Sequence, residues 1–101
     1  MASYTVPEGH VGAHQKQLAA NTVDTVTFTA TDLAEVEILT DGTAAIFVRF
    51  GAGNSPTVAG TNCWQVPSGS GSAVLIPHTS GATVVNLISS GAPVYSVART
   101  R

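Results

Sequence analysis

The feature that most constrains the fold is a repeated alternation of apolar and polar side chains, cut every several positions by turn residues. It begins near Thr22 and continues almost to the end of the chain. Val26 and Phe28, for example, lie on one side of an extended chain, and the threonines between them lie on the other. This period of two predicts seven strands, over residues 23–29, 34–39, 44–50, 63–66, 73–76, 83–89 and 94–98.

Short strands at this spacing predict an all-β fold, an antiparallel two-sheet β-sandwich of the immunoglobulin-like or jelly-roll-like kind. The turn residues do not decide between these two topologies. Asp41-Gly42 predicts a hairpin between the strands that flank it, because both positions tolerate positive φ. Ser90-Gly91 predicts in the same way that the last two strands pair with each other. Residues 51–62, which are rich in glycine, form a long loop.

Length and charge limit the class of protein. The chain has 101 residues, enough for one domain. Only 10% of the residues are charged, and four Lys+Arg against six Asp+Glu give a net charge of −2. Such a composition supplies no basic surface for nucleic acid. A neutral surface rich in Thr and Ser is common in proteins that pack against neighbours.

Cysteine usage and hydropathy bear on where the chain is assembled. Cys63 is the single cysteine, so an intramolecular disulfide cannot form and nothing favours an oxidising compartment. The residues after Met1 lack the basic and apolar regions of a signal peptide. The longest apolar stretches, such as residues 44–48, are too short to span a membrane. We therefore expect synthesis and folding in a cytoplasm.

The first twenty residues differ from the rest of the chain. They contain Pro7 and two glycines and almost no β-branched alternation. An extended chain of this length reaches roughly 66 Å, several times the radius of a small domain. A mobile tail is one interpretation of this segment. The apolar residues within it favour another, an extended docking arm over residues 1–20 that lies on a partner and precedes a sandwich domain over 21–101.

The strand over residues 83–89 is apolar on both of its sides. Val84 and Ile88 share one side, and Val85 and Leu87 share the other. One side of a strand in a two-layer sandwich packs in the core, so a second apolar side needs a further cover. That cover is either another part of this chain or a neighbouring subunit, and the sequence leaves both open.

Candidate catalytic and metal-binding residues are few. His10 and His14 are four residues apart, which suits two metal ligands on a helix, but Pro7 and the nearby glycines argue against a helix there. Cys63 has no charged residue close in sequence to activate its thiol. The glycines that begin at Gly51 lack the Gly-Lys-Ser/Thr ending of a phosphate loop. We predict no catalytic residue, no metal site and no cofactor, and therefore a protein that is not an enzyme.

A resemblance extends this interpretation. The segments VPEGHVGAHQKQLAANTVDTVTF, AEVEIL and ATVVNLISSGAPVYSVA, with the Asp-Gly turn among them, resemble small head decoration proteins of tailed bacteriophages that infect actinobacteria. The resemblance covers nearly the whole chain. It implies a virion structural protein, assembled in the host cytoplasm, that binds the outer surface of the major capsid protein lattice and stabilises the head.

The resemblance also implies which residues make contacts. The arm would contact the capsid through Tyr4, Val6, His10, Val11 and His14. Independently of the resemblance, aromatic type and the two-sided apolar strand indicate Trp64, Val84, Ile88 and Tyr95 as anchors in a subunit interface or in the core. Self-association is implied as well, with a trimer favoured by analogy.

An alternative from a different class is a receptor- or carbohydrate-binding β-module of a phage tail or fibre. Trp64, Tyr95 and the loop over residues 51–62 would then form an exposed aromatic platform. The exposure of Trp64 discriminates between the two. A buried indole argues against sugar binding, whereas an exposed indole flanked by polar groups supports it.

Overall fold

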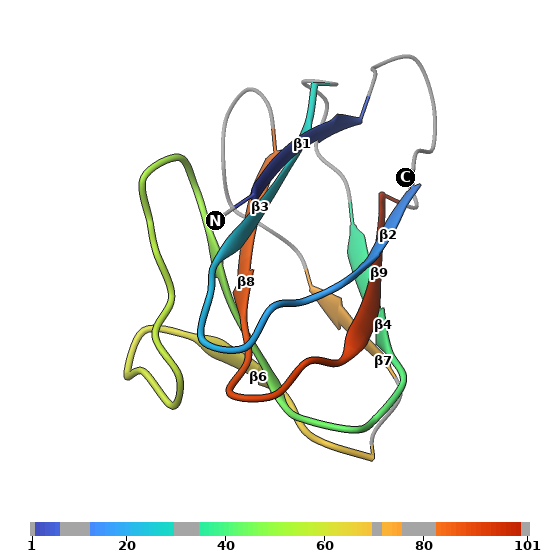
Figure 1. Ribbon diagram of the computed structural model, residues 1–101. Coiled ribbons are helices and arrows are strands. Elements are labelled where there is room, and N and C mark those ends of the chain that lie inside the picture. The colour runs from blue at the N-terminus through green and yellow to red at the C-terminus, as the bar shows by residue number, and fades with distance from the viewer. Residues whose placement is uncertain (1, 7–12, 30–34, 70–71, 76–82, 100–101) are drawn as a thin grey trace.

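The computed structural model describes residues 2–6, 13–29, 35–69, 72–75 and 83–99 (Figure 1). All of its regular elements are strands, and within these residues there is no helix of the length and hydropathy needed to cross a membrane. The strands are β1 (Ala2–Val6), β2 (Ala13–Gln17), β3 (Asp24–Phe28), β4 (Val36–Thr40), β5 (Ile46–Phe50), β6 (Trp64–Val66), β7 (Ser72–Leu75), β8 (Thr83–Ile88) and β9 (Val94–Arg99). The seven strands expected from alternation are all present, with ends within two residues of the prediction.

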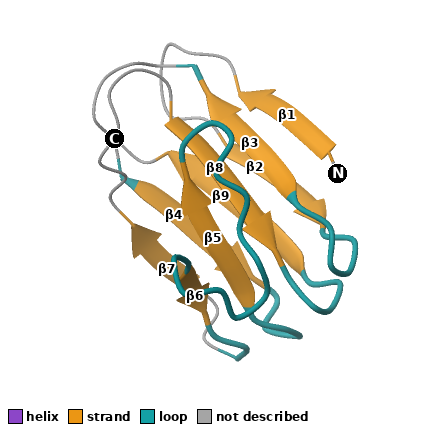
Figure 2. Cartoon of the chain, turned by 90° about the vertical axis from the view of Figure 1, so that its left-hand side faces the viewer, coloured by secondary structure: helices purple, strands orange, loops and turns teal. Residues whose placement is uncertain are grey.

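The strands form two packed sheets. Sheet A has the order β1-β3-β8-β5-β6, and sheet B has the order β2-β9-β4-β7 (Figures 1 and 2). The predicted two-sheet β-sandwich is therefore confirmed.

Four antiparallel pairs are nested in one another. β5 pairs with β6, β4 with β7, β3 with β8, and β2 with β9. Strands β2 to β5 therefore pair in reverse order with strands β6 to β9, as the two halves of one long hairpin would. The hairpin is rolled up, so that successive strands of each half lie in alternate sheets. This is the strand order of a jelly roll, the choice that the sequence left open. β1 is additional to this scheme and pairs in parallel with β3.

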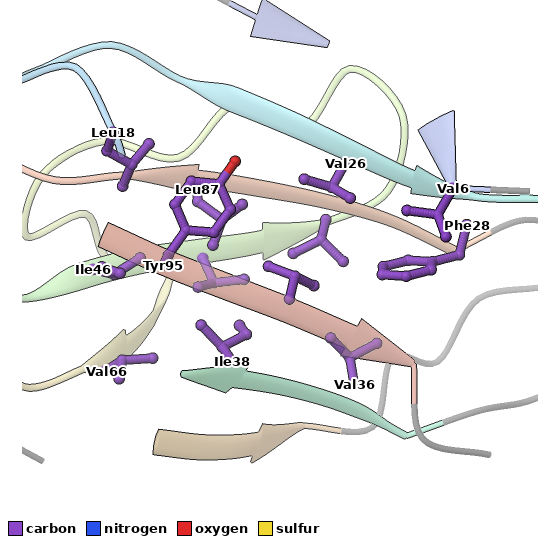
Figure 3. Close-up of a cluster of buried hydrophobic side chains, with 13 residues drawn as sticks. Val6, Leu18, Val26, Phe28, Val36, Ile38, Ile46, Val66, Leu87 and Tyr95 are labelled. Atoms are coloured by element: carbon purple, nitrogen blue, oxygen red, sulfur yellow. The ribbon is translucent and has the colours of Figure 1, made fainter. Parts of the chain in front are cut away.

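The core lies between the sheets and is built from the inward side of each alternating strand. In β3 the burial pattern alternates strictly, with Val26 and Phe28 inside. Tyr95 reaches from β9 into the space between the layers (Figure 3). The core comprises Val6, Leu18, Val26, Phe28, Val36, Ile38, Ile46, Val48, Val66, Val85, Leu87, Tyr95 and Val97.

The predicted hairpins at Asp41-Gly42 and Ser90-Gly91 are wrong. β4 lies in sheet B and β5 in sheet A, and β8 and β9 are divided in the same way. The backbone of the first turn is as expected at Gly42, which adopts a positive φ, of 80°. A turn residue fixes the local path of the chain, but it does not determine which layer the next strand joins, since both layers offer an apolar face.

In the described part of the N-terminal segment, residues 2–6 and 13–17 are strands, and both strands belong to the sandwich. β1 joins the edge of sheet A and β2 joins the edge of sheet B. Leu18 follows β2 and is 1% exposed, and its N–H donates to the carbonyl of Pro93 at 2.9 Å. The described strands of the expected arm over 1–20 therefore pair with strands of the expected domain over 21–101. Edge strands bury few side chains, so their sequences carry little alternation.

Candidate functional site

Trp64 is the most exposed large apolar side chain in the described part of the chain, with 59% of its surface accessible. It opens β6, the edge strand of sheet A, and pairs with Val48 of β5. Val48 and Val66 are both fully buried. Trp64 therefore lies on the inward side of sheet A, at the edge of that sheet, where its indole ring remains open to a partner.

The chain reaches Trp64 through a folded turn. The N–H of Gly60 donates to the carbonyl of Thr57 at 2.9 Å, and the thiol of Cys63 lies 3.7 Å from that same carbonyl oxygen. Val58, in this turn, is 38% exposed, and Gln65, which follows Trp64, is exposed. The segment that leads to Trp64 is therefore held by these two contacts, and the exposed side chains of Val58 and Gln65 are uncharged.

The loop between β5 and β6 runs across the outer face of sheet A (Figure 2). A buried amide holds its first residues. Asn86 of β8 accepts a hydrogen bond from the Thr25 hydroxyl at 2.8 Å and donates to the Gly51 carbonyl at 2.9 Å. Asn54 donates from its side chain to the Phe50 carbonyl at 2.8 Å. These contacts fix the start of the segment that ends at Trp64.

A second polar cluster joins the two sheets. The Tyr95 hydroxyl donates to Asp24 Oδ2 at 3.0 Å in a buried position, and Lys16 Nζ lies 3.6 Å from the same oxygen. Lys16 also lies 5.1 Å from the centre of the Tyr4 ring. Burial, followed by the negative charge of Asp24, raises the pKa of Tyr95. The hydrogen bond with Tyr4 raises the pKa of Lys16, and the charge of Asp24 adds to this.

This cluster holds strands together and does not offer an open reaction site. Its four residues come from β1, β2, β3 and β9, so it ties both edge strands of the N-terminal segment to the roll. The Asp24 side chain is 2% exposed, which leaves no room for a substrate at the carboxylate. The Asp24 carboxylate is buried together with its hydrogen-bond and ion-pair partners, Tyr95 and Lys16, which is the arrangement of a structural contact.

The structure places the predicted arm contacts in different settings. Val6 is buried in the chain's own core, and Tyr4 is half-buried against that core. The backbone of His14 lies in β2, paired with β9. His10 and Val11 lie outside the described residues. Tyr4 and Val6 thus belong to the sandwich itself in this conformation.

The predicted anchor residues also lie in different parts of the structure and differ in exposure. Tyr95 is buried in the core and Trp64 is exposed, so they do not form the shared aromatic platform expected for a sugar-binding site. Ile88 lies on the outer side of sheet A, next to Phe47, and is 8% exposed within the single chain. Val84, on the same side, is half-buried. The second apolar side of this strand is therefore largely covered within the chain.

One exposed apolar residue was missed by the sequence analysis. Leu39 of β4 is 43% exposed, and it pairs with Ser96 of β9. In the sequence it ends an alternating strand on the side of Glu35 and Glu37, which alternation predicts to face outward, but it was not singled out as an exposed residue. For metals, no three His, Cys, Asp or Glu residues come together in the described ranges in a way that could hold an ion.

Comparison with known proteins identifies the fold. No protein-family model matches the sequence, and no curated protein matches it. The chain is similar to the crystal structure of Aeromonas hydrophila PliG, a periplasmic lysozyme inhibitor of g-type lysozyme, with a TM-score of 0.58 and 15% identity over 98% of each chain.

Two further structures share the architecture. CBM_E1, a carbohydrate-binding module found in a sugar cane soil metagenome and complexed with cellopentaose and gadolinium ion, has a TM-score of 0.54 and 13% identity over 91% of this chain and 87% of its own. The pre-peptidase C-terminal domain of collagenase from Bacillus anthracis has a TM-score of 0.51 and 10% identity over 92% and 91%. At these identities the likeness is one of fold alone.

Proposed function

We propose that this chain is a non-enzymatic virion structural protein, a head decoration protein that binds the outer surface of the major capsid protein lattice. The resemblance of its sequence to such proteins motivates the proposal. The observation that carries it is an exposed tryptophan, Trp64, on a domain in which only 10% of residues are charged. A neutral domain with one large exposed anchor is suited to packing against another protein.

The physical case rests on what an exposed indole gains when it is covered. A tryptophan buries a large apolar area with few rotatable bonds, and it is among the residues that most often dominate protein interfaces. Trp64 also lies where the backbone is held by the Gly60 turn, so little order has to be gained on binding. The turn that precedes Trp64 also carries Val58, a smaller apolar residue that is 38% exposed.

The proposed role is stabilisation by mass action. A protein that binds the assembled lattice better than its separate subunits shifts the equilibrium towards the lattice. Many copies, each with a modest interface, add their effects because they act on one connected shell. Self-association on the lattice, with a trimer as the favoured state, would link neighbouring sites.

Two variants of β6 test this proposal. Trp64→Ala removes the indole, whereas Gln65→Ala changes the next exposed residue of the same strand and serves as the matched control. We expect Trp64→Ala to weaken co-sedimentation with empty shells of the major capsid protein at least tenfold, about 1.4 kcal/mol, and Gln65→Ala to leave it nearly unchanged. Equal binding by Trp64→Ala and the parent protein would remove this anchor from the proposal.

The single tryptophan provides a second measurement. Because the chain contains one Trp, its tryptophan emission, excited at wavelengths that the two tyrosines do not absorb, reports only on Trp64. Covering the ring with capsid protein should shift its emission to shorter wavelength, and a tryptophan-free chain cannot give that signal. Shells that bind the domain without changing the emission would place the contact elsewhere on the sandwich.

A carbohydrate-binding module is the second candidate, and the exposure of Trp64 is the observation that favours it. An indole face stacks on a pyranose ring, and Gln65 is a polar neighbour able to bond sugar hydroxyls. CBM_E1 has the same fold and binds cellopentaose in its structure. Titration with cellopentaose and with host cell-wall glycans, followed by Trp64 fluorescence, separates the two candidates: saturable quenching supports the module, and no response supports the capsid protein.

A further inference from the structure

β1 is the strand that the fold does not need. The four nested pairs of the jelly roll use β2 to β9, and β1 is added at the open edge of β3. It pairs in parallel, which is slightly less stable per residue than the antiparallel pairing of the other neighbours. Removing β1 would leave both sheets with their remaining strand order intact.

The contacts that hold β1 are few and specific. Beyond the ladder with β3, the Ala2 N–H donates to the Val23 carbonyl and the Thr29 N–H donates to the Val6 carbonyl, each at 3.3 Å. Val6 is buried in the core, and the ring of Tyr4 lies under the Lys16 ammonium. The strand itself, ASYTV, carries no charge. The β3 edge thus forms a seat that recognises one short uncharged strand by two alternate side chains.

The connection to β2 is short in sequence but long enough to change partners. Six residues, 7–12, separate β1 from β2, and they include Pro7 and two glycines. A chain of this length reaches roughly 20 Å when extended. The shortest dimension of the molecule is 21 Å. A β1 strand that leaves its own β3 can therefore reach the β3 edge of a second molecule where that edge lies within about 20 Å of the start of β2.

We propose that β1 is exchanged between two copies of this chain, so that the β1 strand of each occupies the β3 edge of the other. Every contact described for β1 is reproduced in the exchanged pair, because the seat and the strand are the same. Reciprocal exchange of an identical element is a low-cost route to a closed dimer. The inference deepens the self-association in the proposed function and assigns it a closed dimer in solution in place of the trimer favoured by analogy. It concerns copies in solution, so its failure would leave capsid binding through Trp64 untouched.

A disulfide trap tests the exchange between separate molecules. Thr5 and Thr27 are partners in the β1–β3 register, and both lie on the outer side of sheet A. Neighbouring strands are about 4.8 Å apart, within the range that a disulfide can bridge. We would mix full-length chains that carry Thr5→Cys or Thr27→Cys, each with Cys63→Ser, under mild oxidation. One chain is isotope-labelled, so that mass spectrometry identifies mixed dimers.

The control is a mixture of Thr5→Cys with Ser96→Cys, since Ser96 lies half-exposed on the outer side of sheet B. We expect the Thr5→Cys and Thr27→Cys mixture to give at least tenfold more mixed disulfide dimer than this control. Equal yields in the two mixtures would show only random collision and would overturn the exchange.

A locked chain provides an independent measurement. With both substitutions in one molecule, oxidation at low concentration ties β1 to its own β3. The oxidised chain should remain monomeric at concentrations where the reduced chain forms dimers, as measured by light scattering after size exclusion. Dimers that persist after locking would show that the copies associate through another surface, and a reduced chain that stays monomeric would likewise contradict the exchange.

Discussion

At the residue scale, Asp41 connects the turn after β4 to the start of β9. Its backbone N–H donates to the Val94 carbonyl at 3.1 Å, and its carboxylate accepts from the Val94 N–H at 3.1 Å. The same carboxylate accepts from the N–H and the hydroxyl of Thr43 at 3.1 and 2.8 Å. These donors, with the Val94 N–H first, lower the pKa of Asp41 below 3.8. An exposed aspartate thus carries a structural role.

This arrangement predicts an acid-dependent loss of stability. Because the folded-state pKa of Asp41 is lowered, its contribution is complete above about pH 3.8 and is lost as the pH falls through the folded value. Asp41→Asn should lower the urea midpoint at pH 7, and its difference from the parent protein should shrink as the pH falls below about 3.8 and the Asp41 carboxylate becomes protonated. Thr43→Ala, which removes one donor, should show a smaller loss in the same pH range. A constant difference at all pH values would contradict this role.

The two aromatic residues that the sequence analysis singled out show what a single sequence can predict at this scale. Trp64 and Tyr95 both sit in short apolar strands, and both were predicted as core or interface anchors. Tyr95 is in a central position of sheet B, so it is buried, whereas Trp64 is on an edge strand. Alternation indicates which side of a strand a residue lies on. It does not indicate the position of that strand in the sheet, and that position decided exposure.

At the element scale, two glycine turns contact each other. The Gly69 N–H donates to the Gly42 carbonyl at 3.1 Å, so the turn after β4 is bonded to the turn after β6. Both glycines have positive φ, of 80° and 81°. A side chain at Gly42 would lie 3.3 Å from the backbone of Gly69, whereas one at Gly69 would meet nothing within 4 Å. The two positions share the same backbone conformation and differ in the space around them.

This difference makes a matched pair of substitutions informative. Gly69→Ala should lower the free energy of unfolding by roughly 1–2 kcal/mol, the cost of a left-handed conformation for an L-residue. Gly42→Ala should cost more, because the backbone of Gly69 has to shift as well. Urea unfolding of the two variants at pH 7 measures both values. Equal losses would show that the two turns are not in close contact in solution.

The strands themselves divide into those that alternation identifies and those that it does not. β3, β4 and β5 each bury one side against the opposite sheet, and their alternating sequences show it, whereas β8 is apolar and largely buried on both sides. β2 reads AHQKQ and lies at a sheet edge, where it is held by pairing with β9 and by polar contacts of Lys16 and Gln17. Neither the backbone pairing nor these single polar contacts produce an alternating pattern in the sequence. For the same reason the sequence could not show that β1 pairs in parallel with β3.

At the scale of the whole molecule, the sequence predicted the class of fold and left the topology open. Burial requires only that each strand turn its apolar side towards the other layer, and several strand orders satisfy this. The nested pairing of β2–β5 with β6–β9 depends on contacts between distant residues, such as Ala13 with Ala98. The same limit applies to the candidate site. The sequence analysis selected Trp64 because it is a large aromatic residue, but its accessibility results from the position of β6 at the edge of the sheet.

The nested pairing also predicts how the molecule folds. The pair β5–β6 closes the shortest loop, with Val48 opposite Trp64, whereas β2 and β9 must join the two ends of the chain. Closing the inner pair first lowers the entropic cost of each pair outside it. We therefore expect refolding in milliseconds to seconds, as for other β-sandwiches. Val66→Ala, in the inner pair, should mainly slow refolding, and Leu18→Ala, beside the outer pair, should mainly speed unfolding. Stopped-flow circular dichroism measures both rates, and the reverse assignment would place the first contacts at the termini.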